Sequence, residues 1–147
     1  QKVRLSGAVI VTTPQDVALA DAIKGIAMFR KVGVPILGLI ENMSFFACPR
    51  CEHRTEIFGH GGGKRQADRL QVPFLGEVPL DPAIRAGGDE GRPVVSDAPE
   101  SPQAEAFRAI AAAVGEAIDP DRGRSDRAAG PGLIDRIRRG LSRDSDA

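Results

Sequence analysis

The two cysteines of the chain, Cys48 and Cys51, are separated only by Pro49 and Arg50. Two thiols at this spacing can hold one soft metal centre as thiolates or close a disulfide. A tandem pair in a sequence with no further cysteine is typical of metal or redox chemistry in a reducing compartment, and not of a secreted disulfide framework. The pair is therefore the first place in the sequence where a function is expected.

A zinc site and a redox dithiol are two alternatives for this pair. With His53 and His60 the cysteines would form a Cys2His2 site within one chain, although the spacing Cys-x2-Cys-x-His-x6-His departs from zinc-finger patterns. Four cysteines would also bind zinc across a dimer. A redox dithiol usually opens a helix, whose dipole lowers the thiol pKa, whereas Pro49 interrupts the segment here. The residues by themselves leave these alternatives open.

Composition limits the classes of function. Lys and Arg together number 20, as do Asp and Glu, so the formal net charge is zero and no overall field attracts nucleic acid. The 147 residues suffice for one domain with a buried core. No apolar run approaches the roughly 18 residues of a membrane span, and the first residues lack the apolar centre of a signal peptide. We therefore expect a cytoplasmic protein that does not bind nucleic acid.

Strand and helix patterns alternate at the start of the chain. Residues 8–11 are apolar and β-branched, which predicts a strand buried on both faces of a parallel sheet rather than an edge strand. Thr13 is a candidate helix N-cap with Pro14 at the first helical position. Residues 36–40 predict a second buried strand after one crossover. The cysteines therefore follow the carboxyl end of a strand, where open α/β sheets bind ligands.

The remaining pattern completes an α/β fold. Residues 43–58 predict an irregular excursion with a small hairpin, 72–79 a third strand, 89–102 a loop and 104–118 an amphipathic helix, while Asp81 is a candidate N-cap. Three parallel strands buried on both sides need neighbours that this chain does not contain. We therefore expect the carboxyl half of a doubly wound, mainly parallel sheet with helices on both faces.

The glycine-rich residues 59–64 precede a predicted helix, where backbone N–H groups can approach a phosphate. A Walker A loop has a glycine, four residues and then Gly-Lys-Ser/Thr, but here Phe58 replaces the first glycine and Arg65 replaces the Ser/Thr. We interpret this segment as a turn that starts a helix.

The chain divides into a domain over residues 1–118, a linker over 119–131 and a basic, amphipathic or disordered tail over 132–147. The linker has Gly, Pro, Ser and alternating charge without an apolar period. One helical face of the tail carries Leu133, Ile134, Ile137 and Leu141. This face, surrounded by arginines, could contact an anionic membrane. It is only about two turns long, so a frayed tail or a helix docked on its own domain is the simpler interpretation.

Four segments resemble, in unbroken order, the Mrp/ApbC family. They are residues 6–15 (SGAVIVTTPQ), 38–51 (GLIENMSFFACPRC), 57–63 (IFGHGGG) and 72–81 (VPFLGEVPLD). The family comprises P-loop ATPases of the MinD/ParA/nitrogenase-iron-protein class that act as iron–sulfur cluster carriers. The resemblance extends from residue 5 to residue 114 and implies a P-loop NTPase-like domain over residues 1–118.

The resemblance implies roles for five residues. Cys48 and Cys51 match the cluster ligands, and a cluster held by cysteine takes four thiolates, so a homodimer joined through this loop would bridge one cluster, expected to be [4Fe-4S]. Asn42, at the end of its strand, matches the position that hydrogen-bonds the adenine of ATP. Pro79 and Asp81 belong to the segment that closes over the base. The recipients would be apo iron–sulfur proteins.

The family's Walker A loop, switch regions and Walker B aspartate match no residues of this sequence. The resemblance places them upstream of residue 1, so Mg2+ coordination and ATP hydrolysis are expected to need that missing half, and the chain alone is expected to be inactive as an ATPase. No catalytic residue is predicted. The alternative to a cluster carrier is a MinD/ParA-like interaction module with a structural zinc site or a membrane contact through the tail.

Overall fold

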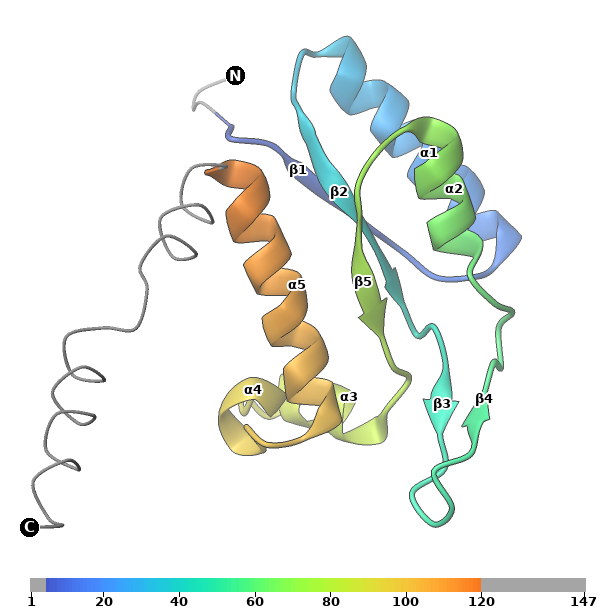
Figure 1. Cartoon of the computed structure of the whole chain (residues 1–147), viewed down its shortest axis with the longest axis vertical. Helices are drawn as coiled ribbons and strands as arrows, with labels where there is room; N and C mark the ends of the chain where they lie inside the picture. The colour runs from blue at the N-terminus through green and yellow to red at the C-terminus, as the bar shows by residue number, and fades with distance from the viewer. Residues whose placement is uncertain (1–4, 120–147) are drawn as a thin grey trace, which may run out of the picture.

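The computed structural model describes residues 5–119, and within them a three-stranded parallel sheet has the order β1-β2-β5. The strands are β1 (Ala8–Thr12), β2 (Ile36–Asn42) and β5 (Phe74–Val78). The long helices are α1 (Asp16–Lys31), α2 (Gly62–Leu70) and α5 (Pro102–Ile118). Figure 1 shows α1 and α2 on one side of the sheet and α5 on the other. The predicted parallel α/β sheet with helices on both faces is confirmed.

A short hairpin and two short helices extend beyond the carboxyl end of the sheet. An antiparallel hairpin of β3 (Phe46–Ala47) and β4 (Arg54–Thr55) projects away from the sheet, as predicted for residues 43–58. Helices α3 (Pro82–Asp89) and α4 (Val94–Asp97) lie beside the start of α5 (Figure 1). The prediction of a loop throughout residues 89–102 is wrong at α4. This single turn is too short to show a helical period, and it forms where Val94 is buried against the neighbouring helices.

A buried apolar cluster lies between the sheet and the pair α1 and α2, and Ile110 of α5 is buried on the other face. The members of the cluster are Ile10, Ile26, Leu39, Ala67 and Val72. Leu39, in the central strand, is fully buried, and Ile26 of α1 is almost fully buried. These contacts hold β2, whose carboxyl end carries the residues of the candidate site.

Within residues 5–119, β1 lies at one edge of the sheet, where it pairs with β2 alone. Val11 is 58% exposed, so the prediction that residues 8–11 are buried on both faces is wrong. Their apolar, β-branched character favours a strand, but burial depends on which elements cover it. Helix α1 covers the face with Ile10, whereas α5 packs on β5 and β2.

Helix α1 begins later than predicted. Its N-cap is Gln15, which has an extended backbone and makes no capping hydrogen bond with its side chain. The predicted N-cap, Thr13, lies before this position, and its carbonyl accepts a hydrogen bond from the Thr12 hydroxyl at 3.2 Å. The prediction named the right segment and the wrong cap.

No helix in residues 5–119 is long and apolar enough to cross a membrane. The predicted tail over residues 132–147, and all but the first residue of the predicted linker over 119–131, lie outside the described residues.

Candidate functional site

The two cysteines lie in the loop that joins β3 to β4 at the tip of the hairpin. Both are free thiols; Cys48 is partly buried and Cys51 is exposed. The N–H of Cys48 donates to the carbonyl of His53 at 3.0 Å, and the N–H of Glu52 donates to the carbonyl of Cys48 at 2.8 Å. Glu52 has a left-handed backbone, with φ of 58°. The loop is therefore closed by its own backbone hydrogen bonds.

Backbone N–H groups of this loop are directed at one thiol. Those of Arg50 and then Cys51 donate to the sulfur of Cys48 and lower its pKa from the usual range, with a further contribution from the Cys51 side chain. A metal ligand must be the thiolate, and N–H donors stabilise that form. The loop thus favours the thiolate form of Cys48.

The cysteines have no additional metal ligands beside them in the described part of the chain. No group of three or more His, Cys, Asp or Glu side chains there is placed to hold a metal ion. The Nδ1 atom of His60 lies 2.7 Å from a carboxylate oxygen of Glu56. The Cys2His2 zinc site considered from the sequence, with His53 and His60, is therefore not assembled within residues 5–119. A centre with four thiolates would take two of them from outside these 147 residues.

Arg54 on β4 fastens the hairpin to the sheet. Its guanidinium lies 3.7 Å from the ring centroid of Phe45, and its Nη2 donates to the Glu77 carboxylate on β5 at 2.9 Å. The N–H of Leu80 donates to the carbonyl of Phe45 at 2.7 Å, so the chain after β5 also runs beside the start of the hairpin. The cysteine loop is therefore carried on a hairpin that is bonded at its base.

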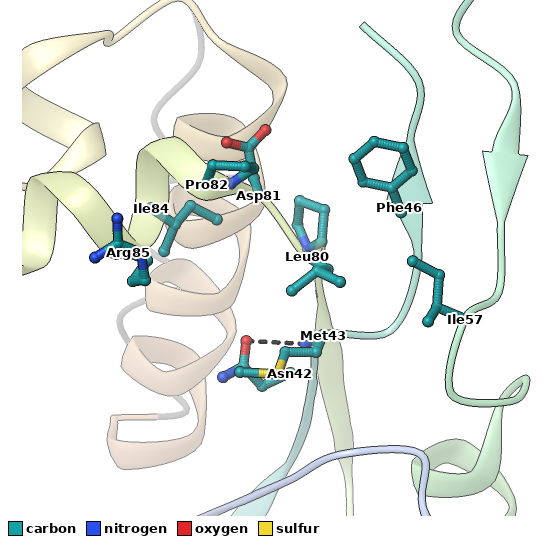
Figure 2. A pocket seen from close by; sticks show the side chains of 10 residues that line it. Asn42, Met43, Phe46, Ile57, Leu80, Asp81, Pro82, Ile84 and Arg85 are labelled. Atoms are coloured by element: carbon teal, nitrogen blue, oxygen red, sulfur yellow. Dashed lines mark hydrogen bonds between the residues drawn. The ribbon is translucent and has the colours of Figure 1, made fainter.

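A pocket of about 480 Å³ lies between the end of β2, the hairpin and the start of α3 (Figure 2). It is lined by Asn42, Met43, Phe46, Ile57, Pro79, Leu80, Asp81, Pro82, Ile84 and Arg85. All three residues that the resemblance associates with adenine, Asn42, Pro79 and Asp81, are in this lining. They meet because β2 and β5 are adjacent and parallel, with Asn42 in register with Val78.

Hydrogen bonds within the chain fix two polar side chains of the pocket, Asn42 and Asp81. Asn42 Oδ1 accepts the N–H of Met43 at 2.9 Å (Figure 2), which holds the amide at the carboxyl end of β2. Asp81 is the N-cap of α3, as predicted, and accepts the N–H of Ala83 at 2.7 Å. Its other oxygen accepts a hydrogen bond from Gln103 at 2.5 Å. The Asp81 carboxylate thus joins α3 to α5 and shapes the pocket wall.

The hairpin supplies one wall of the pocket. Figure 2 shows Phe46 and Ile57 on the hairpin side and Pro82 and Ile84 on the α3 side. Phe46 lies in β3, two residues before Cys48, which is in the loop that follows this strand. A ligand in the pocket would therefore touch the segment that carries the cysteines.

Glu41 is a buried carboxylate that sequence reasoning did not identify. It is 0% exposed, its Oε1 accepts the hydroxyl hydrogen of Ser44 at 2.6 Å, and its Oε2 accepts the N–H of Gly63 at 2.5 Å. A carboxylate of the protein therefore occupies the amino end of α2, consistent with residues 59–64 as a helix start and not a phosphate loop. The available signal was a lone charge at the end of the apolar run 36–40.

Comparison with known proteins places this arrangement in a family. Residues 1–115 match the family model described as "ParA: NUBPL iron-transfer P-loop NTPase". The chain belongs to this family. Membership confirms the resemblance to iron–sulfur carriers of the P-loop class that the motifs indicate. The iron–sulfur cluster transfer protein NUBPL of Dictyostelium discoideum is 54% identical over 110 residues, which are 75% of this chain and 34% of that protein.

Solved structures of the family's wider class share the fold. A nucleotide-binding protein from Archaeoglobus fulgidus in complex with ADP matches with a TM-score of 0.56 and 36% identity, covering 68% of this chain and 40% of that one. The cell division ATPase MinD of Pyrococcus furiosus matches with a TM-score of 0.57 and 32% identity, covering 76% and 43%. The chain spans about a third of the length of the curated relatives it matches.

Proposed function

We propose that the chain contains the cluster-binding part of an iron–sulfur cluster transfer protein, with Cys48 and Cys51 as the ligands. The observation that carries this proposal is the Cys-x2-Cys loop at an exposed hairpin tip, with N–H groups directed at Cys48, in a member of an iron-transfer family. A cluster held by cysteine takes four thiolates, and each chain offers two. A two-fold homodimer through the hairpin tips would supply all four.

The position of the loop suits transfer of a cluster as cargo. Cys51 is exposed and Cys48 is partly buried, so a cluster bridged at the tips would be open to the thiolates of an apo iron–sulfur recipient. Exchange of thiolate ligands one at a time requires such access. We propose a [4Fe-4S] cluster as the cargo. Two symmetric pairs of cysteines provide the four ligands that it takes, and because a [2Fe-2S] cluster takes four as well, the iron content of the dimer distinguishes the two.

We also propose that the pocket takes the adenine of ATP. Its apolar walls suit a flat base, and Phe46 offers an aromatic ring beside it. The amide of Asn42 can accept from the exocyclic amine and donate to a ring nitrogen, the pairing that Asn makes with adenine. Phosphate and Mg2+ binding, and ATP hydrolysis, are assigned in this proposal to a Walker A sequence outside these 147 residues.

Anaerobic reconstitution with iron and sulfide tests the cluster proposal. The chain should become a coloured dimer with about four irons per two chains. Cys48→Ser and Cys51→Ser should each abolish the colour, whereas His53→Ala should retain it. Mixing with a colourless apo [4Fe-4S] protein should move the iron to that recipient. Stoichiometric zinc without a chromophore, or a coloured monomer, would contradict the proposal.

Titration with adenosine tests the pocket without requiring a phosphate site. Adenosine should shift the NMR signals of residues around Asn42 and Phe46, while guanosine should not. Asn42→Ala should remove the response, and His53→Ala, outside the pocket lining, should leave it unchanged. An equal response to both nucleosides would show that Asn42 does not read the base.

A further inference from the structure

One carboxylate bonds both ends of the segment that carries the cysteines. This segment leaves the sheet after β2 and joins α2 at Gly62. Ser44 lies at its start, and Gly63 is the second residue of the helix at its end. The two oxygens of Glu41 accept from these residues, at 2.6 Å from Ser44 Oγ and 2.5 Å from Gly63 N. The entry and the exit of the segment are therefore joined through a single side chain.

The contact is enclosed and leaves the carboxylate little room to move. Glu41 is 0% and Ser44 1% exposed. A Cβ at position 63 would lie 2.9 Å from Glu41 Oε2, so glycine is what allows the carboxylate to reach this N–H. Hydrogen bonds to an ionised acceptor are stronger than neutral ones, and an anion at the amino end of a helix is further stabilised by the helix dipole.

We propose that Glu41 is the positioning residue of the cysteine hairpin, holding both ends of the segment from Ser44 to Gly63 so that Cys48 and Cys51 are presented in one geometry. Glu41 acts through Ser44 and Gly63 and touches neither cysteine. Its effect on cluster retention rests on the proposed function, whereas its effect on the hairpin is a property of the chain without a cluster.

The same strand end also serves the pocket. Successive strand residues face opposite sides of a sheet, so Glu41 is directed at α2 while the next residue, Asn42, lines the pocket. Phe46 and Ile57, the hairpin wall of the pocket, lie between the two ends that Glu41 joins. Loss of the Glu41 hydrogen bonds to Ser44 and Gly63 should therefore disturb this wall together with the cysteine loop.

Three variants of the full chain test the inference without a cluster. Glu41→Ala removes both acceptors, and Glu41→Gln keeps the shape, with an oxygen for Gly63 and an NH2 group for Ser44. Ile110→Ala, on α5, is the control because it removes buried packing against β5 on the other face of the sheet. The readouts are hydrogen exchange of the Cys48 N–H, which donates to the His53 carbonyl, and the alkylation rates of both thiols.

Glu41→Ala should accelerate exchange at Cys48 and thiol alkylation by about tenfold or more, since hydrogen bonds to a charged group are lost. Glu41→Gln should stay within about threefold of the original chain, because one hydrogen bond to each end remains. Ile110→Ala should leave both rates near the original after correction for its global unfolding. Equal acceleration by Glu41→Ala and Ile110→Ala, or none by Glu41→Ala, would overturn the inference.

Two further measurements keep the test decisive. If Glu41→Ala does not fold, Ser44→Ala takes its place, because it removes one of the two hydrogen bonds to Glu41. It should accelerate hydrogen exchange at Cys48 by about threefold or more. An unchanged exchange rate would overturn the inference. In the reconstituted dimer, Glu41→Ala should release iron to a chelator several-fold faster than Ile110→Ala, and equal release would contradict the effect on retention. If the original chain takes up no cluster, the proposed function fails, while the exchange rates still decide the role of Glu41.

Discussion

Replacement of Gly63 by alanine should destabilise the chain, whereas the same replacement at Gly25 should stabilise it. Both glycines lie in helices, where alanine is intrinsically favoured by about 1 kcal/mol. A Cβ at position 63 would lie 2.9 Å from Glu41 Oε2 and 3.1 Å from a methyl carbon of Leu39, and both of those side chains are fully buried. A Cβ at position 25 meets nothing within 4 Å.

The contacts around each glycine set the expected change in the free energy of unfolding. Overpacking a buried site costs about 1–3 kcal/mol, and displacing the carboxylate weakens a hydrogen bond to a charged group worth about 1.5–3 kcal/mol. After the gain in helix propensity, Gly63→Ala should lower the free energy of unfolding by about 2 kcal/mol. Gly25→Ala should raise it by up to about 1 kcal/mol.

Urea unfolding followed by circular dichroism measures both changes, provided that the slopes of the transitions remain equal. Gly115→Ala, in α5 with nothing within 4 Å of its added Cβ, is a second control and should behave like Gly25→Ala. An unfolding midpoint for Gly63→Ala that rises as much as those of the controls would refute the reasoning. It would mean that the Glu41 carboxylate does not occupy the space beside Gly63.

Three further predictions follow from the site. In folded Cys51→Ala, the pH midpoint for alkylation of Cys48 should lie below that of the same variant unfolded in urea. The backbone N–H groups that remain lower the pKa of Cys48, so the reactive thiolate is present at lower pH. Equal midpoints would count against the loop geometry. Asp81→Ala should lower the free energy of unfolding in urea by about 0.5–2 kcal/mol, since the cap of α3 and the bond to Gln103 are both lost; an unchanged midpoint would contradict this. Arg54→Ala should cost less than about 1 kcal/mol globally because its ion pair is partly exposed, yet it should accelerate hydrogen exchange in the hairpin; a large global loss with unchanged hairpin exchange would reverse this interpretation.

The residues of the candidate pocket were predictable because their signals are local. Asn42 was expected at the end of a buried strand and is the last residue of β2. Asp81 was expected as an N-cap because it precedes Pro82, and it caps α3. The cysteines were expected in an irregular segment with a hairpin, and they lie at its tip. Each of these expectations depends on a few neighbouring residues, and the parallel order of β2 and β5 then brings Asn42 and Asp81 to one pocket.

Other features depended on contacts that no local pattern contains. Val11 has the residue type of a buried strand and is 58% exposed, because it lies on an edge strand whose second face α5 does not cover. Arg54 shows no local sign of its partner Glu77, which lies 23 residues further along the chain. The start of α1 at Asp16, after the Gln15 cap, also differs from the local preference for Thr13.

The sequence alone determined the order of the three sheet strands and the long helices, the family motifs and the presence of a thiol pair suited to soft metal chemistry. These follow from side-chain type, spacing and backbone preference over a few residues. Only the tertiary structure decided that Glu41 joins the two ends of the cysteine segment, since its two partners lie 3 and 22 residues away. A buried carboxylate must find donors wherever the fold brings them, and packing of α2 on β2 brings Gly63 to Glu41.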